Sequence, residues 1–182
     1  MTDHLCNFLR DNQLDKQYLE QASRWFQLLL EDLVDRSHHT NDNRTLLVGI
    51  SGCQGSGKST LANYLTLQLN HSFGLTTEYC SLDDFYLSRS ARQTLSETIH
   101  PLLATRGVPG THCVENAITA LTKISRGQST GLPIFDKSTD DISDKVRTIP
   151  AGLDIFIFEG WCLGASHQNE LQLKKAINQL ER

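Results

Sequence analysis

The sequence predicts an α/β fold with a mostly parallel sheet and helices on both of its faces. Two short apolar runs, residues 45–50 and 153–161, have the composition of buried strands. Stretches with helical periodicity alternate with such runs, and a glycine-rich loop joins the first run to a helix. This alternation predicts a parallel sheet, because each crossover between parallel strands needs a connection that packs on a face of the sheet.

The first expected element is an amphipathic helix over residues 15–35, whose apolar and aromatic side chains recur at helical spacing. We expect this apolar stripe to pack on the rest of the protein. A polar connector with turn residues follows at 36–44. The chain is thus expected to consist of an N-terminal helical segment, residues 1–40, packed on a main domain, residues 41–182.

The main domain is expected to continue the alternation of strands and helices after its first strand. The predicted elements are a helix at 58–70, a strand at 76–82, a long loop with a short helix at 87–110, a helix at 111–124, a short strand followed by a charged loop at 132–150, the strand at 153–161 and a final helix at 168–182.

Composition sets limits on the class of protein. The chain has 182 residues, 38% hydrophobic and 21% charged, which suits one globular domain with a substantial core. The net charge is −4 and no long basic run occurs, so nucleic acid is not an expected partner. The five cysteines form no C-x-x-C pair, which argues against a disulfide framework or a structural zinc site.

Targeting signals are not apparent in the sequence. The N-terminus lacks a basic region followed by an apolar one, so no signal peptide is expected. The longest apolar stretch, "LDIFIF", is too short to cross a membrane. We therefore expect a cytoplasmic protein without a membrane partner.

The glycine-rich loop carries the strongest chemical signal. Residues 52–59, "GCQGSGKS", fit the phosphate-binding pattern G-x-x-x-x-G-K-[ST] between a strand and a helix, which predicts the three-layer fold of P-loop NTPases. Glycines let backbone N–H groups surround an anion, and the helix N-terminus adds positive potential. Lys58 is expected to contact the β- and γ-phosphates, and the Ser59 hydroxyl to bind Mg²⁺. The expected phosphate-binding residues are Gly52, Cys53, Gln54, Gly55, Ser56, Gly57, Lys58, Ser59 and Thr60.

Carboxylates follow two other predicted strands, where ligands of parallel sheets bind. Glu159 comes directly after "IFIF" and has the position of a Walker-B acid beside Mg²⁺; the alternative is a solvated carboxylate at a strand end. Asp83 and Asp84 end the strand at 76–82. Either is a candidate base for a hydroxyl proton, and the alternative is that one of them caps a helix.

Cations in the loops are candidates for binding an anionic substrate. Arg106, Lys137 and Arg147 are the three that we expect to face an anion, although each alone is more often a solvated surface charge. His112 either hydrogen-bonds a substrate hydroxyl or packs within its loop. The expected acceptor site contains Asp84, Tyr86, Arg106, His112 and Lys137.

Five ordered motifs together resemble the D-glycerate 3-kinase family of P-loop kinases: "GISGCQGSGKSTL", "SLDDFYL", "HPLLATRGVPGTH", "LPIFDKSTDD" and "FEGWCLGA". That family is similar to a wider group with uridine kinase, phosphoribulokinase and bacterial pantothenate kinase. The resemblance implies transfer of the γ-phosphoryl group of MgATP to a hydroxyl of a small molecule, with D-glycerate as the leading candidate. It also implies Lys58, Asp83 and Glu159 as catalytic residues, with Asp83 as the base, and Ser59 and Glu159 at the metal.

The chain departs from the family pattern in three places. Cys113 stands where the family usually has Asp after "GTH", and Ile142 stands where it usually has Arg after "KSTDD". Family members also continue past the end of this chain, with a further strand, lid helices and adenine contacts, so the kinase domain is expected to be incomplete at its C-terminus.

The sequence is therefore compatible with three functions, which it favours to different degrees. The first is an ATP-dependent small-molecule kinase. The second is a truncated kinase-like protein that binds nucleotide without catalysis. The third is a P-loop GTPase or switch, which is disfavoured because no N-K-x-D guanine-reading tetrapeptide occurs in the chain.

Overall fold

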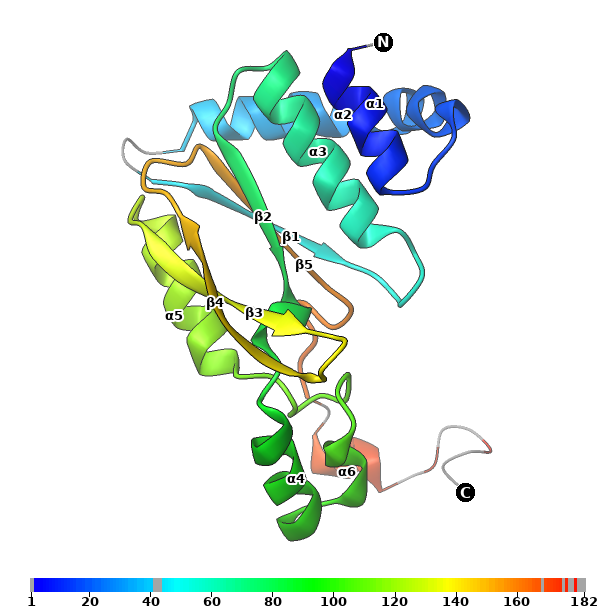
Figure 1. Cartoon of the computed structure of the whole chain (residues 1–182), viewed down its shortest axis with the longest axis vertical. Helices are drawn as coiled ribbons and strands as arrows, with labels where there is room; N and C mark the ends of the chain where they lie inside the picture. Colours follow the sequence, from blue (N-terminus) through cyan, green and yellow to red (C-terminus); the bar gives the residue numbers. More distant parts are fainter. Residues whose placement is uncertain (1, 41–43, 168, 175, 177–178, 180–182) are drawn as a thin grey trace.

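The computed structural model confirms the α/β fold. It describes residues 2–40, 44–167, 169–174, 176 and 179. Within these residues, the parallel sheet has three strands in the order β1-β5-β2 (Figure 1). They are β1 (Leu46–Ser51), β5 (Ile155–Gly160) and β2 (Thr77–Ser81), and β5 pairs in parallel with each of the other two.

The central strand is the most buried, as its sequence predicted. Ile155, Phe156 and Ile157 of β5 are fully buried, because helices cover both of its faces. The register sets Glu159 beside Ile50 of β1 on one side and beside Ser81 of β2 on the other. The loops that follow β1 and β2 therefore start on either side of Glu159.

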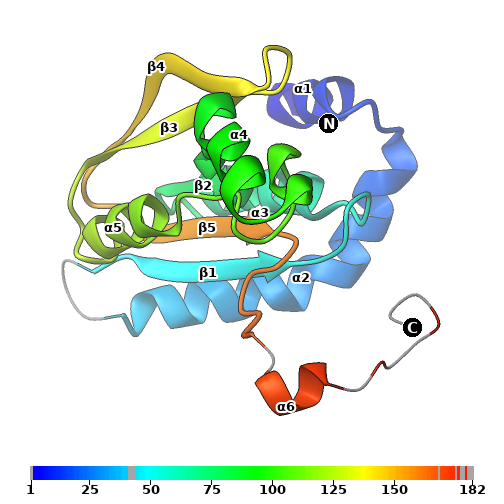
Figure 2. The same ribbon diagram turned by 90° about the horizontal axis from the view of Figure 1, so that it is seen from below.

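One face of the sheet is covered by α1 (Asp3–Asp11), α2 (Lys16–His38) and α3 (Lys58–Ser72) (Figures 1 and 2). The predicted helix at 15–35 is α2, and the Asp15 carboxylate caps it by accepting hydrogen bonds from the backbone N–H groups of Gln17 and Tyr18. The short α1 was not predicted. Phe8 of α1 packs beside Tyr64 of α3, so the N-terminal segment shares the core of the main domain.

The opposite face is covered by α5 (Val114–Ser125), which packs on β5 and β2 through Ala117, Ala120 and Ile124. It begins after Cys113, slightly later than predicted. This cover is incomplete over β1, where Leu47 is 40% exposed.

An antiparallel hairpin lies next to this layer and corrects one prediction. Residues 132–150 were expected to form a short strand and a charged loop, but they form β3 (Thr130–Asp136) and β4 (Asp141–Ile149). The apolar side chains Ile142 and Val146 of β4 are exposed, so its sequence lacks the alternation of a half-buried strand. Pairing with β3 makes most of β4 a strand, and burial is confined to Ile149 at its end.

The remaining short elements surround the carboxyl ends of the strands. The predicted loop with a short helix contains α4 (Arg89–Thr98) and the 3₁₀ turn η2 (Pro101–Ala104), and a second 3₁₀ turn, η1 (Leu82–Phe85), follows β2 directly. Of the predicted final helix at 168–182, only α6 (Glu170–Leu173) is seen; 168, 175, 177–178 and 180–182 lie outside the described residues. No helix among the described residues combines the length and the hydropathy that a membrane crossing requires.

Candidate functional site

The phosphate loop has the backbone that its sequence predicted. Gly55 and Gly57 adopt φ values of 75° and 84°, which side chains with a Cβ rarely tolerate, and Gly57 is the N-cap of α3. A Cβ at Gly52 would lie 2.8 Å from the Ser56 hydroxyl oxygen. The loop therefore needs these glycines for its close turn from β1 into the N-terminus of α3. Cys53 in the same loop is exposed.

Glu159 meets the first turn of α3 at the base of this loop. The Ser59 Oγ donates a hydrogen bond of 2.7 Å to Glu159 Oε1, and the Lys58 Nζ lies 4.0 Å from Oε2. Glu159 is 2% exposed, and its Oε2 has no hydrogen-bond partner within the described part of the chain. The carboxylate is buried, which contradicts the alternative of a solvated strand end.

This arrangement fits the requirements of Mg²⁺. The ion prefers oxygen ligands, and beside phosphates it is usually held by one or two protein oxygens and several waters. The Ser59 hydroxyl and the unpartnered oxygen of Glu159 are oxygen groups of the kind that could hold such an ion. No group of three or more His, Cys, Asp or Glu side chains suited to a metal occurs among the residues that the structure describes. The site therefore suits an ion that is bound partly by phosphate oxygens better than an ion that is held by protein ligands alone.

Asp83 lies on the other side of β5, in η1. The Ser81 hydroxyl caps this turn by accepting from the Asp83 backbone N–H, so the Asp83 carboxylate is not needed as the cap. That carboxylate accepts hydrogen bonds from Lys137 Nζ (2.7 Å) and from the Tyr86 hydroxyl (3.1 Å). Burial raises the pKa of Asp83, but the hydrogen bonds and charge of Lys137 outweigh it, so the pKa lies below its ordinary value. Asp83 is ionised at neutral pH.

Asp84 has the opposite electrostatic environment. Burial raises its pKa, and hydrogen bonding from the backbone of Phe135 and Ser81 only partly offsets this effect. Asp84 thus connects η1 to the last residue of β2 and to β3. Of the two candidate bases, Asp83 is the one with a salt bridge to a loop lysine.

Tyr86 and His112 form the wall next to Asp83. Their rings stack with centroids 4.3 Å apart, and their backbones form a single antiparallel bridge. Burial lowers the pKa of His112, which keeps the imidazole neutral at neutral pH, and burial also raises the pKa of Tyr86. His112 Nε2 is buried and has no hydrogen-bond partner among the described residues. Of the two interpretations of His112, the packing one accounts for its ring but not for this nitrogen.

The three predicted loop cations are separated. Lys137 reaches Asp83, as described. Arg106 pairs with Asp140 at the turn of the β3-β4 hairpin, with its guanidinium 5.8 Å from the centroid of the Phe135 ring. Arg147 pairs with Glu78, near the opposite end of β2 from Asp83, so it does not join this cluster.

One structural residue of the site was missed by the sequence analysis. Arg92 of α4 is fully buried, pairs with Asp140 at 3.0 Å, and donates to the backbone oxygens of Leu87 and Ala104. It fixes α4 to the hairpin turn and so positions the segment that carries Arg106. An arginine in a polar helix resembles a surface charge, and its sequence context carries no signal of burial.

Comparison with curated proteins shows similarity to kinases. The chain is 36% identical over 135 residues to the uncharacterized kinase mug58 of Schizosaccharomyces pombe, which covers 68% of this chain and 48% of that protein. It is 29% identical over 160 residues to the pantothenate kinase of Lactococcus lactis, covering 87% and 48% respectively. The chain thus spans about half the length of the curated relatives it matches. No family model matches it.

Solved structures show the same relationship. The D-glycerate 3-kinase from Cryptococcus neoformans superposes with a TM-score of 0.70 at 33% identity, over 80% of this chain and 53% of that one. A possible uridine kinase from Bacillus stearothermophilus gives a TM-score of 0.57 at 25% identity, over 75% and 71%. The resemblance to P-loop kinases of the glycerate, pantothenate and uridine kinase group is confirmed.

Proposed function

We propose that this chain, which has the fold of the P-loop kinases, binds MgATP at the phosphate loop and transfers the γ-phosphoryl group to a hydroxyl of a small acceptor. D-Glycerate is the leading candidate acceptor. The observation that carries the proposal is the pair of sites on either side of the end of β5. One side has Lys58, Ser59 and the buried Glu159, and the other has the ionised Asp83.

The donor side supplies charge. Backbone N–H groups of residues 52–60 surround the phosphates, and Lys58 contacts the β- and γ-phosphates. Ser59 and Glu159 hold Mg²⁺, which when bound neutralises charge on the phosphate oxygens. These groups act in a partly buried site, so their electrostatic effect is larger than it would be in water.

The acceptor side supplies orientation and a proton acceptor. In the proposed reaction, the acceptor oxygen forms a bond to the γ-phosphorus, the bond to the β-phosphate oxygen breaks, and the hydroxyl proton passes to Asp83. Tyr86 and Lys137 hold the Asp83 carboxylate in place through their hydrogen bonds. The unpartnered Nε2 of His112 is available for a second polar group of the acceptor.

The acceptor is proposed to carry a negative charge. Lys137 and Arg106 are cations within the loops that flank Asp83, with side chains 61% and 34% exposed, so both remain accessible from solvent. A carboxylate or phosphate on the acceptor would pair with either of them. This charge preference supports a hydroxy acid such as D-glycerate over a neutral nucleoside.

The test is release of ADP from MgATP by the purified chain, with and without D-glycerate, beside pantothenate and uridine as alternative acceptors. We expect stimulation by D-glycerate, loss of activity in Lys58→Ala and in Asp83→Asn, and unchanged activity in Lys123→Ala, a substitution on the far helix α5. Stimulation by another acceptor would replace D-glycerate as the substrate. ATP binding without ADP release from any acceptor would favour the alternative function, a nucleotide-binding protein without catalysis.

A further inference from the structure

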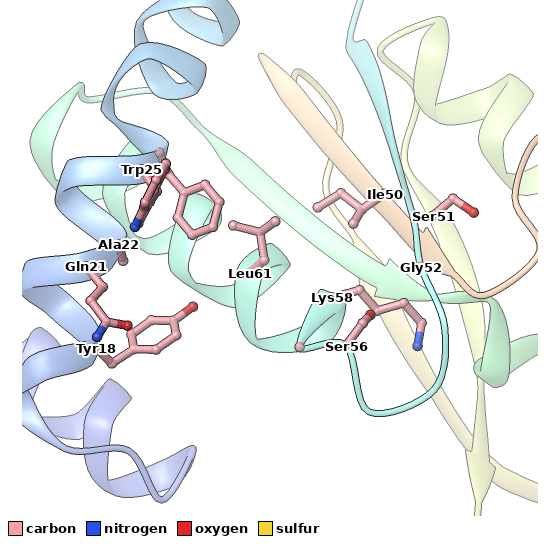
Figure 3. Close-up of a pocket in the computed structure, with 12 residues that line it drawn as sticks. Tyr18, Gln21, Ala22, Trp25, Ile50, Ser51, Gly52, Ser56, Lys58 and Leu61 are labelled. Carbon is pink, nitrogen blue, oxygen red and sulfur yellow. The ribbon is translucent and has the colours of Figure 1, made fainter.

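A cavity of about 410 Å³ lies between α2 and the phosphate loop. Figure 3 shows Tyr18, Gln21 and Trp25 on α2, across from Ser56 and Lys58 of the loop. The three α2 residues are spaced so that they share one face of the helix. The N-terminal helix therefore forms one wall of a cavity whose other wall is the phosphate site.

The position of the cavity relative to the acceptor decides what it can bind. The sheet order is β1-β5-β2, and Asp83 follows β2. Figure 2 shows α2 beside β1, on the side of the sheet away from β2. A nucleotide with its γ-phosphate directed at Asp83 must leave the phosphate loop on the β1 side. The cavity beside α2 lies on that side of the sheet.

The lining has the chemistry of a base-binding site. Trp25 and Tyr18 present aromatic rings, and Trp25 is 71% exposed. The guanidinium of Arg24 lies 5.7 Å from the centroid of the indole, so one face of this ring already contacts a cation. The Gln21 amide makes no hydrogen bond within the described part of the chain, and it offers both a donor and an acceptor. A mostly apolar pocket with a few polar side chains is typical of small-molecule sites.

We propose that this cavity binds the base of the nucleotide, with Trp25 stacking on the base and Gln21 hydrogen-bonding its edge. The inference rests on the proposed function, since it assumes that phosphates occupy the loop. Helix α2 would then take a direct part in nucleotide binding as well as packing on the main domain.

The test separates the base from the phosphates. Isothermal titration calorimetry would measure the Kd of ATP and of inorganic tripolyphosphate, both with Mg²⁺, for the wild-type chain and four variants. Trp25→Ala is expected to weaken ATP binding by about tenfold or more, the usual effect of removing a stacking aromatic, and to leave tripolyphosphate binding unchanged. Trp25→Phe is expected to retain most of the affinity for ATP. Gln21→Leu is expected to weaken ATP alone.

Leu28→Ala is the matched control, because Leu28 is 79% exposed on the same helix and does not line the cavity. Three outcomes would overturn the inference while leaving the kinase proposal intact. Trp25→Ala could change the Kd of ATP and of tripolyphosphate equally, it could change neither, or Leu28→Ala could have the same effect as Trp25→Ala. Failure of the wild-type chain to bind either ligand would overturn both. Since Trp25 and Leu28 are exposed, neither alanine variant removes core packing.

Discussion

Asp83 and Asp84 are neighbours in sequence whose environments shift their pKa values in opposite directions. Asp83 contacts the cation of Lys137, which overcomes the effect of burial, whereas for Asp84 the effect of burial prevails. The sequence "SLDDFYL" contains both carboxylates but not this difference, because Lys137 comes from a distant loop. The choice between the two as base is thus an electrostatic question that tertiary contacts decide.

Lys137→Met tests this assignment. The substitution removes the hydrogen bond and charge that lower the pKa of Asp83, and the burial that raises it remains. In the wild-type chain, Asp83 loses its negative charge only as the pH falls through its lowered pKa. We expect the acid limb of the pH profile of ADP release to move to higher pH in the variant. Lys145→Met, at an exposed position of β4, is the control. An acid limb at the same pH in the wild-type chain and in both variants would contradict the role of Asp83.

Glu159→Gln tests the metal side. The amide retains an oxygen for the Ser59 hydroxyl but removes the negative charge beside Lys58 and the anionic oxygen proposed for Mg²⁺. We expect ADP release to fall by about 10²–10³-fold, the usual effect of losing one electrostatic contact in an active site. The concentration of Mg²⁺ required for half-maximal activity should rise. A variant with wild-type activity and an unchanged Mg²⁺ requirement would exclude Glu159 from the metal site.

At the scale of elements, the end of β5 must approach η1 closely. A Cβ at Gly160 would lie 2.8 Å from the Cβ of Leu82, and Leu82 immediately precedes the two aspartates. Gly160→Ala therefore displaces η1 and the carboxylate of Asp83. We expect a loss of about 1–3 kcal/mol in the free energy of unfolding, as overpacking usually causes, with a larger loss of activity than this destabilisation explains.

The control for that substitution is Gly49→Ala in β1, where an added Cβ meets no atom within 4 Å among the described residues. Urea denaturation and ADP release would be measured for both variants. Equal effects of the two substitutions would show that loss of glycine in a strand, rather than contact with Leu82, causes the change.

The position of α4 depends on the buried side chain of Arg92. Arg92→Met keeps much of the volume but removes the charge beside Asp140 and leaves the Leu87 and Ala104 carbonyls without their donor. We expect the variant to lose about 1–3 kcal/mol of stability, the usual cost of leaving hydrogen-bonding groups in a partly buried site without their donor. The exposed Arg89→Met, on the same helix, should lose little. Guanidinium denaturation compares the two, and similar midpoints would contradict this role of Arg92.

At the scale of the whole molecule, ligand binding should be visible as thermal stability. At MgATP concentrations about 100 times its Kd, binding adds about 2.7 kcal/mol to the free energy of unfolding. For a domain of this size, that corresponds to a rise in Tm of about 5–10 °C. Differential scanning fluorimetry tests this with three samples: the wild-type chain with MgATP, the wild-type chain with ATP and EDTA, and the Lys58→Ala variant with MgATP. Equal rises in all three samples would indicate binding outside the phosphate loop.

The sequence predicted most of the sheet and the backbone of the glycine-rich loop. The apolar runs of β1 and β5 and the glycines of the loop have signals within a few residues, because their burial and their backbone are set locally. The expected carboxyl-end position of Glu159 likewise depended only on its strand. Its burial beneath Lys58 and Ser59 agrees with that expectation.

The features that the sequence did not predict are those that depend on distant partners. Strand β4 exists because β3 pairs with it, the short α1 depends on the packing of Phe8 beside Tyr64 of α3, and the burial of Arg92 requires Asp140 from the hairpin turn. The cavity wall on α2 is another case. The apolar stripe of this helix was expected to pack on the rest of the protein, but Trp25 is 71% exposed beside the loop.

The central position of β5 has a consequence for how the chain folds. Leu46 of β1 and Thr77 of β2 both lie opposite Ile155, so neither earlier strand has its partner in the sheet until residues 155–160 are present. Pairing of such distant segments is slow, because a long loop must close before any hydrogen bond forms. During synthesis, β1 and β2 would remain unpaired until β5 has been made. The interval before residues 155–160 emerge is therefore the period of greatest exposure to aggregation and of greatest need for a chaperone.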